Sequence, residues 1–341
     1  MKDILGILKT SRKVYKGFKM LKQSSKTPDF AYAAMKNLFV QTNGRSNNII
    51  SILIRKKGYN NISKEGVLGI NSSSELQRVV TNITKNGYHI FDKKLPAEVI
   101  DSIVEYAKKT PCSYRIISSG ETKNFKIEFS DEVLFDENQP LSPVYQFSQK
   151  NIVACRDLQK LIFDQSLLLV AQSYLNTKPV LDLVAMWWSI PFGGKGKSES
   201  AQMYHFDLDR IKFIKFFFYL TDVDSETGPH CYVKGSHRRL PASLNKQGRM
   251  TDEEVTAAFG KENLLELCGK KGTIMAVDTR GLHKGKPLSK DRRLIFQLEF
   301  ANSMFGQYYP PCEKPDLTGD LENIFEKYKE TYQHIMKRRY V

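Results

Sequence analysis

Residues 204–220 of the chain read YHFDLDRIKFIKFFFYL and place two candidate metal ligands just before a strongly hydrophobic segment. The apolar run from Phe213 to Leu220 predicts a β-strand. Alternate residues of an extended chain share a face, so His205 and Asp207 should point the same way, with Phe206 opposite. An imidazole and a carboxylate placed in this way can supply two adjacent ligands to one metal ion.

A third ligand must come from another part of the chain. His283, at the end of the segment DTRGLH (278–283), is the best candidate. Two histidines and one carboxylate on one face of an octahedron leave three positions open, which suits a non-haem Fe(II) centre that binds a chelating cosubstrate and dioxygen. A His-x-Asp triplet alone is weak support, because such triplets occur by chance and a single histidine is more often a surface or core residue.

An arginine strengthens the iron interpretation. Arg293 lies ten positions after His283, at the head of a predicted strand that begins LIFQL (294–298). A guanidinium group there could hold a carboxylate through two parallel hydrogen bonds, as the far end of 2-oxoglutarate requires. Arg292 is the alternative, since adjacent strand residues face opposite ways and a shift of one residue would exchange the two. The spacing from His283 favours Arg293.

Helical patterns come first in the chain and strand patterns afterwards. The expected helices cover 29–40, a Pro-led segment from Pro96, and an apolar-faced segment from Asp157 to Leu175. After a short strand near Tyr88, the expected strands cover 180–190, 212–221, 272–277 and 294–300. This order indicates an α+β fold rather than alternating α/β.

The two ends of the chain should flank the main domain. Residues 1–84 are expected to form a basic N-terminal helical extension and a loose connection, because 41–74 is rich in Asn, Ser, Gly and Lys. The main domain should cover 85–305. Apolar residues at helical spacing predict a C-terminal docking helix within 306–341.

The first 26 residues hold eight Lys or Arg and one acid, Asp3. Interleaved apolar residues give this segment the pattern of an amphipathic helix. A helix packed on its domain with a solvated basic face is the more usual outcome, and peripheral contact with an anionic membrane is the alternative.

The overall composition excludes some classes of protein. Apolar content of 41% and charged content of 26% are ordinary for a soluble globular protein, and no run reaches the roughly 18 apolar residues of a membrane span. Five widely spaced cysteines, with no C-x-x-C pair and no secretory leader, predict a reduced, cytoplasmic setting. The net charge of +15 favours an anionic partner but does not distinguish nucleic acid, lipid and small molecule.

Four separate stretches form a combined pattern that is more specific than any one of them. They are Gly87-Tyr88-His89-Ile90 with the Pro-led helix, Tyr204-His205-Phe206-Asp207, Thr227-Gly228-Pro229 with Lys234-Gly235-Ser236-His237, and Gly272 through His283 to Arg293. In these stretches, which span about 85–303, the chain resembles the phytanoyl-CoA dioxygenase family of 2-oxoglutarate oxygenases.

The resemblance implies a double-stranded β-helix core, which is a jelly-roll or cupin-like fold. It implies that Fe(II) is held by His205, Asp207 and His283, and that 2-oxoglutarate is anchored by Arg293, with Arg292 as the competitor. Related halogenating enzymes replace the carboxylate ligand by a small residue, so the presence of Asp207 favours hydroxylation. The expected partners are a small-molecule substrate and dioxygen, and no nucleic acid is expected.

A glycine-rich segment, GGKGKS (193–198), superficially fits a phosphate-binding P-loop. The motif requires Gly where this chain has Pro191, and no helix follows to receive the phosphates. A loop beside the iron site is the better interpretation. Lys195 and Lys197 could then meet an anionic substrate, with Lys284 and Lys286 beside them at the cavity mouth; solvated loop lysines are the alternative.

Other aromatic and histidine residues have weaker assignments. Trp187 or Trp188 should face the barrel interior, where core packing is more usual than lining a substrate pocket. His230 and Cys231 should face opposite ways and serve locally, and His237 should hydrogen bond at a strand end. The alternative of another class is a non-catalytic basic binding protein on a jelly-roll scaffold, with no iron affinity and a salt-sensitive association with nucleic acid or anionic lipid.

Overall fold

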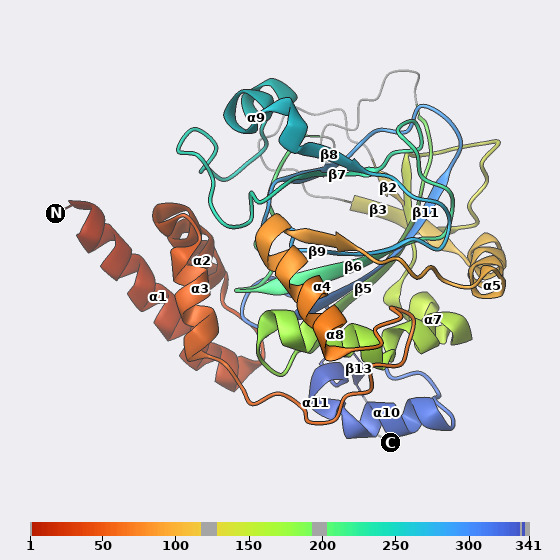
Figure 1. Cartoon of the computed structure of the whole chain (residues 1–341), viewed down its shortest axis with the longest axis horizontal. Coiled ribbons are helices and arrows are strands. Elements are labelled where there is room, and N and C mark those ends of the chain that lie inside the picture. Colours follow the sequence, from red (N-terminus) through yellow and green to blue (C-terminus); the bar gives the residue numbers. More distant parts are fainter. Residues whose placement is uncertain (1, 117–127, 193–202, 335, 338–341) are drawn as a thin grey trace.

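The chain folds around two antiparallel β-sheets that face each other (Figure 1). The computed structural model describes residues 2–116, 128–192, 203–334 and 336–337. In these residues the larger sheet has eight strands, which in order of pairing are β1 (Tyr88–Ile90), β9 (Ile274–Val277), β6 (Phe213–Tyr219), β11 (Arg293–Ala301), β5 (Val180–Ser189), β4 (Val144–Gln146), β2 (Cys112–Ile116) and β3 (Glu128–Val133). The smaller sheet consists of β10 (His283–Gly285), β7 (His230–Val233) and β8 (Leu264–Leu267). The predicted α+β jelly-roll is confirmed.

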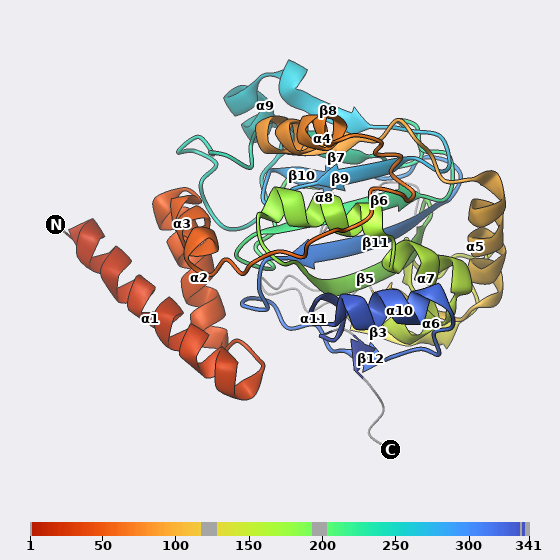
Figure 2. The ribbon, with the colours of Figure 1, turned by 60° about the horizontal axis from the view of Figure 1, so that its bottom comes forward.

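One face of the larger sheet is apolar and covered by helices. Leu294, Phe296 and Leu298 alternate along β11 and join the main core cluster on this face. The covering helices are α4 (Ser73–Asn86), α5 (Ala97–Lys109), α6 (Gln149–Ala154), α7 (Arg156–Ile162), α8 (Gln165–Leu175), α10 (Asp320–Lys327) and α11 (Lys329–Tyr332). Figure 2 shows α7, α8 and α10 lying across the sheet.

The other face of the larger sheet looks toward the smaller sheet. Phe217 and Tyr219 of β6 share a buried cluster with Tyr232 of β7 and Leu267 of β8. The outer face of the smaller sheet is covered by α9 (Asp252–Phe259), which is followed by a 3-10 turn at Lys261–Asn263. The space between the sheets therefore receives inward side chains from both.

Three helices lie at one end of the molecule: α1 (Lys2–Ser24), α2 (Asp29–Thr42) and α3 (Arg45–Leu53) (Figures 1 and 2). The prediction of a loose connection is wrong over α3. Gly44, at a φ of +79°, turns the chain between α2 and α3, and the buried Asn47 donates to the Ile211 carbonyl over 3.0 Å. Polar composition suggested a loop, but tertiary contacts stabilise a helix. Within the described residues, no helix is both long and apolar enough to cross a membrane.

Two further helices differ from prediction in their extent. The segment 157–175 is divided between α7 and α8, because Asp164 caps α8 by accepting a hydrogen bond from the Leu167 amide over 3.1 Å. Near the C-terminus the expected helix is divided into α10 and α11 by Tyr328. A short parallel pair, β12 (Cys312–Glu313) and β13 (Met336–Lys337), accompanies them.

Candidate metal centre

The two candidate histidine ligands are brought together by direct backbone pairing. The amide of His205 donates to the carbonyl of His283 over 3.0 Å, and the amide of His283 donates to the carbonyl of His205 over 2.8 Å. Residues that exchange both hydrogen bonds in an antiparallel pair place their side chains on the same face. The two imidazole centroids consequently lie 4.4 Å apart.

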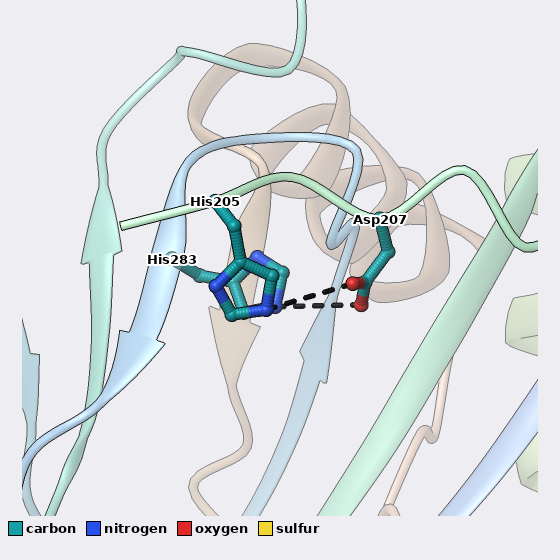
Figure 3. Close-up of side chains that lie close together, drawn as sticks. All are labelled: His205, Asp207 and His283. Atoms are coloured by element: carbon teal, nitrogen blue, oxygen red, sulfur yellow. Dashed lines mark ion pairs between the residues drawn. The ribbon is translucent and has the colours of Figure 1, made fainter. Parts of the chain in front are cut away.

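Asp207 completes a convergent group of three side chains (Figure 3). Its Oδ1 lies 3.7 Å from Nε2 of His205, and its Oδ2 lies 3.3 Å from Nε2 of His283. One ligand atom from each residue lies within 4.8 Å of the others. Phe206 points away and packs on Phe39 of α2, with 5.5 Å between the ring centroids. The alternation expected from the sequence therefore holds here, although 204–207 is joined to its neighbours by isolated bridges rather than by a long strand.

The tautomers of both histidines are set by backbone carbonyls. Nδ1 of His205 lies 3.1 Å from the Met203 carbonyl, and Nδ1 of His283 lies 3.0 Å from the Gly281 carbonyl. Because a carbonyl can only accept, each Nδ1 carries the proton and each Nε2 keeps its lone pair for a metal. Burial, and then His283, lower the pKa of His205 to about 3, so its ring is neutral. Two imidazoles that present Nε2 and one carboxylate form a donor set that fits Fe(II).

The loop before His283 is held by a buried ion pair that the sequence did not reveal. Arg280 donates to Asp278 from Nε over 3.0 Å and from Nη2 over 2.6 Å, and the Tyr174 hydroxyl of α8 donates to the same carboxylate. Burial alone would raise the pKa of Asp278, but Arg280 lowers it to about 2. The Thr279 carbonyl in this loop accepts from the Asp207 amide over 2.8 Å. The loop therefore positions two of the three candidate ligands.

Lys215 of β6 lies beneath the metal centre and contacts three carboxyl groups. Its Nζ lies 2.8 Å from Asp207, 3.0 Å from Asp209 and 3.3 Å from Glu299. Burial acts to raise the pKa of Asp207, but Lys215 and then His283 hold it well below its usual range. Burial, and then Asp182, raise the pKa of Glu299 well above its usual range. Lys215 therefore keeps Asp207 anionic and restricts its rotation.

The two arginines considered for the cosubstrate lie in different environments. Arg293 is buried, and its Nη2 donates to Ser189 of β5 over 3.2 Å while its Nε has no hydrogen-bond partner. Among the described residues, no carboxylate pairs with it. Arg292 is more exposed and forms an ion pair with Glu137. A buried guanidinium without an acidic partner fits an anionic ligand that the chain does not itself supply.

A model of the family described as phytanoyl-CoA dioxygenase matches residues 83–295, which is more than half of the chain. The chain belongs to this family. Together with the triad, membership identifies a 2-oxoglutarate-dependent, non-haem iron oxygenase. A comparison with curated protein sequences found no match.

Several solved structures are similar to this oxygenase. HygX from Streptomyces hygroscopicus, with nickel and 2-oxoglutarate bound, is 14% identical and matches 72% of this chain and 93% of its own at a TM-score of 0.46. The epimerase SnoN of nogalamycin biosynthesis, in complex with Fe3+, alpha ketoglutarate and nogalamycin RO, is 15% identical. The match covers 73% of this chain and 98% of the SnoN chain, with a TM-score of 0.47. EvdO2 from Micromonospora carbonacea var. aurantiaca is 16% identical. The match covers 69% of this chain and 93% of the EvdO2 chain, with a TM-score of 0.47. These likenesses are too distant to indicate the substrate of this oxygenase.

His230 lies beside the candidate ligands of this family member, and its predicted local role stays a prediction. Its ring is 5.3 Å from that of His283 and 5.0 Å from that of Phe217, while Cys231 belongs to the outer cluster of the smaller sheet. The buried Nε2 of His230 has no hydrogen-bond partner. Burial, and then His283 and Arg293, lower its pKa well below the usual range. The alternation of faces was predictable, but the pairing of β7 with β10 was not.

The two tryptophans occupy opposite faces of β5. Trp187 packs against the cluster between the sheets, on the same face as the metal centre. Trp188 is fully buried on the helix-covered face and stacks on Phe135, with 4.8 Å between the ring centroids. Trp187 is thus the inward-facing member of the pair.

The structure describes two of the four lysines that were predicted to attract an anionic substrate. Lys195 and Lys197 lie outside the described residues. Lys284 donates to Asp252 over 2.6 Å, and Lys286 donates to Glu266 over 2.6 Å. Because neighbouring residues of β10 face opposite ways, Lys284 points away from the metal centre. The prediction that these two lysines flank the cavity mouth is therefore wrong for Lys284, and the ammonium groups of both are engaged by carboxylates.

His237 hydrogen bonds locally, as predicted. Its Nε2 lies 3.0 Å from the Thr84 carbonyl at the end of α4. This contact links the turn after β7 to a helix and places the ring outside the triad.

Proposed function

We propose that His205, Asp207 and His283 hold Fe(II) and that Arg293 anchors 2-oxoglutarate, with hydroxylation of a small molecule as the reaction. The observation that supports the metal assignment is the convergence of the two histidine Nε2 atoms on the Asp207 carboxylate, with each Nδ1 engaged by a backbone carbonyl. Arg293 is preferred to Arg292 because it is buried without an acidic partner, whereas Arg292 is paired with Glu137. The family membership supports both parts of this proposal.

The side chains of the protein have distinct tasks in this reaction. Arg293 supplies a fixed positive charge on the inner face of β11, where little water competes. Lys215 orients Asp207, and the carbonyls of Met203 and Gly281 orient the two histidines. When bound, iron and 2-oxoglutarate supply the oxidation, in which dioxygen and the cosubstrate yield succinate and CO2 as the substrate is hydroxylated.

An anaerobic titration of the full chain with Fe(II) and 2-oxoglutarate tests this proposal. We expect a weak visible absorption that requires both components and saturates at one equivalent of iron. His283→Ala should remove the absorption, whereas His89→Ala, in β1, should retain it. A protein that gives no such absorption and binds nucleic acid in a salt-sensitive way would support the non-catalytic alternative, which family membership disfavours.

We further propose that the substrate is anionic. Arg249 is close enough to Asp207 for the carboxylate to influence its pKa, although burial lowers that pKa more strongly. Lys195 and Lys197, in the same inter-strand segment as His205, are the other candidate cations. Turnover should fall with added salt and with Lys195→Ser/Lys197→Ser, while substrate-free consumption of 2-oxoglutarate should respond less. An uncharged substrate turned over equally by the double variant at low salt would exclude this part of the proposal.

The proposal also covers the domain boundaries, the cellular compartment and the partners of the protein. Residues 85–305 would form the oxygenase domain between an N-terminal extension (1–84) and a C-terminal docking segment (306–341), in agreement with the match at 83–295. Five free thiols support a reducing, cytoplasmic compartment. The partners would be dioxygen and a small molecule, with peripheral contact between α1 and an anionic membrane.

A further inference from the structure

Helices α1, α2 and α3 enclose an apolar groove of about 1010 Å³. Phe18 and Tyr15 of α1 line one wall, and Ile49 and Leu53 of α3 line the other. Leu38 of α2 lies between them. Residues three or four apart share one face of a helix, so each wall is a continuous stripe rather than a scattered set. The groove is outside the metal centre and has no part in the chemistry proposed above.

The lips of the groove expose large apolar side chains to solvent. Tyr15 is 64% exposed, Ile49 is 58% exposed and Leu53 is 77% exposed. Of the fourteen exposed large apolar residues in the described part of the chain, eight belong to these three helices: Ile4, Leu5, Leu8, Tyr15, Phe30, Ile49, Ile52 and Leu53. Single exposed apolar residues are common, but a concentration of this kind indicates an interaction surface.

The groove also carries positive charge without compensation. Lys22, Arg45, Arg238 and Arg239 line it, and its lining includes no acidic residue. Within the described residues, no carboxylate forms an ion pair with any of these four. Residues 1–53 hold ten Lys or Arg and two Asp, which gives +8 of the total charge of +15. The surface therefore combines an apolar interior with a cationic border.

We propose that this groove docks the protein on a bilayer of anionic phospholipid, with acyl chains against the apolar stripes and headgroups against the bordering cations. Apolar burial and attraction to anionic lipid act together in peripheral membrane binding. Nucleic acid would match the charge but would not fill an apolar groove. A second copy of the chain would bring two surfaces of the same charge together, which is repulsive.

Docking through the groove would also orient the oxygenase. Leu38 belongs to the same cluster as Phe39, Leu208 and Ile211, and Phe39 packs on Phe206 between the two ligands of the 205–207 loop. Asn43 at the end of α2 both accepts from the Leu240 amide over 2.9 Å and donates to its carbonyl over 2.7 Å. The helices are thus tied to the metal-bearing loop, and a membrane bound at the groove would lie at a fixed orientation to it.

Co-sedimentation of the full-length protein with vesicles tests this inference without turnover, so its result is independent of the proposed oxygenase function. Vesicles of phosphatidylcholine alone are compared with vesicles that also contain phosphatidylglycerol, at roughly 0.1 M and 0.5 M salt. We expect binding to the anionic vesicles that is at least about tenfold stronger than to the neutral ones at low salt. Equal binding to both, or to neither, would overturn the proposal.

Paired variants separate the groove from the contact of α1 alone. Ile49→Ser/Leu53→Ser should weaken binding at least about tenfold, and Leu134→Ser/Leu141→Ser, at two other exposed leucines, should not.

A second pair of variants tests the cations that border the groove. Arg238→Gln/Arg239→Gln should weaken binding about twentyfold at low salt, whereas Lys94→Gln/Lys150→Gln should leave it within about twofold. Lys150 is in α6, which lies at the opposite end of the molecule from α1 (Figure 2). All four variants should keep the far-ultraviolet circular dichroism of the wild-type protein, which verifies folding without reference to the iron site.

Two other results would contradict the groove assignment. If Leu5→Ser/Leu8→Ser abolished binding while Ile49→Ser/Leu53→Ser bound normally, the contact would be made by the exposed face of α1 alone. If the protein formed a concentration-dependent dimer in light scattering that Ile49→Ser/Leu53→Ser dissociated, the occupant would be a second copy of the chain.

Discussion

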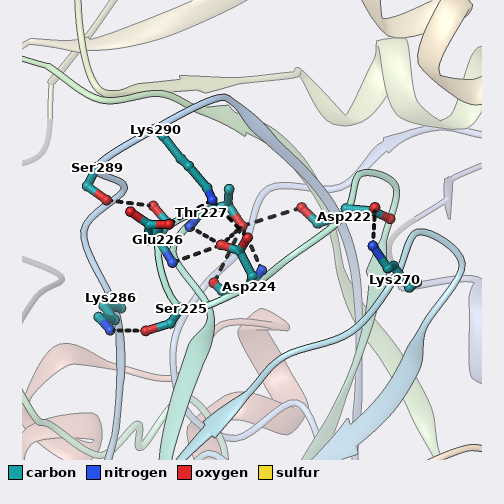
Figure 4. A network of polar contacts seen from close by, with 9 residues as sticks. All are labelled: Asp222, Asp224, Ser225, Glu226, Thr227, Lys270, Lys286, Ser289 and Lys290. Carbon is teal, nitrogen blue, oxygen red and sulfur yellow. Dashed lines mark hydrogen bonds and ion pairs between the residues drawn. The ribbon is translucent and has the colours of Figure 1, made fainter.

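Two polar networks of this oxygenase differ in their access to water. Between the sheets and in the adjoining loop, Asp278 is fully buried and Arg280 is 5% exposed. In the network of Figure 4, formed by the loops that follow β6 and β10 together with Lys270 before β9, the Lys290 side chain is 43% exposed and that of Asp224 is 58% exposed. Both networks have short contacts, so contact distance does not distinguish them. The degree of desolvation distinguishes them, because a buried charge without water depends on its specific partner for stabilisation.

This difference in burial predicts how large an effect each substitution should have. Removing one member of a buried pair leaves an uncompensated charge, while an exposed pair loses little because water replaces the partner. The largest effects should come from the residues between the sheets, and the smallest from the network in Figure 4.

The triad should show the largest effect of all. His283→Ala should abolish succinate formation, because one imidazole and one carboxylate no longer define a face of the iron coordination sphere. Succinate is measured in single-turnover mixtures, with His89→Ala as the control. Full iron-dependent turnover by His283→Ala would contradict the ligand assignment.

The buried ion pair before His283 should be the most sensitive structural contact. Arg280→Met should lower the free energy of unfolding by about 3 to 5 kcal/mol, because it leaves the Asp278 carboxylate buried without its cation. Urea unfolding measures the loss. The double variant Asp278→Asn/Arg280→Met should lose less than the sum of the two single variants. Additive losses would show that the two side chains do not act as a pair.

Loss of Arg293, the proposed anchor of the cosubstrate, should have the next largest effect. Arg293→Ala should raise the concentration of 2-oxoglutarate needed for half-maximal turnover by one to several orders of magnitude, because a charge-assisted contact worth about 2 to 5 kcal/mol is lost. Iron binding should persist. Arg292→Ala, which removes a more exposed pair with Glu137, is the matched control. A defect in Arg292→Ala and none in Arg293→Ala would reverse the assignment.

Local patterns predicted the centre of this fold well. The apolar strands β5, β6, β9 and β11 of the larger sheet were found to within a few residues, because β-branched and aromatic runs are typical of buried strands. The His-x-Asp triplet and a distant His also predicted which three side chains converge. The role of Arg293 stays a prediction. These signals are encoded over short stretches of sequence.

Long-range pairing was not predictable in the same way. The strands of the smaller sheet have three or four residues each, and their register decides that His230 faces His283. The contacts of Lys215 with Asp207 and of Tyr174 with Asp278 join residues whose proximity depends on the folded sheets. The misassignment of Lys284 has the same origin, because its acidic partner lies elsewhere in the chain.

The free energy of unfolding should depend on pH in the acid range because of the buried Asp278. Its pKa is about 2 in the folded chain, below the ordinary value of 3.8, so its contribution to stability is complete above pH 4 and is lost as the pH falls from about 4 to 2. The advantage of the wild-type protein over Asp278→Asn/Arg280→Met should shrink by about 2 kcal/mol across this range. Urea unfolding at several pH values measures the difference. A constant difference would show that Asp278 is not depressed in the folded state.

The smallest effect should come from Lys286, which sequence patterns had placed at the cavity mouth. It donates to Glu266 and to Ser225 over 2.6 Å each, in the exposed network of Figure 4. Lys286→Ala should change the free energy of unfolding by no more than about 1 kcal/mol, because water competes for both partners. The change should decrease at high salt, where the attraction between exposed charges is screened. The requirement for 2-oxoglutarate and the salt dependence of turnover should match those of the wild type, since the ammonium group is engaged on the surface. A loss comparable to that of Arg280→Met would show that exposure does not separate the two networks, and altered salt dependence of turnover would return Lys286 to the substrate path.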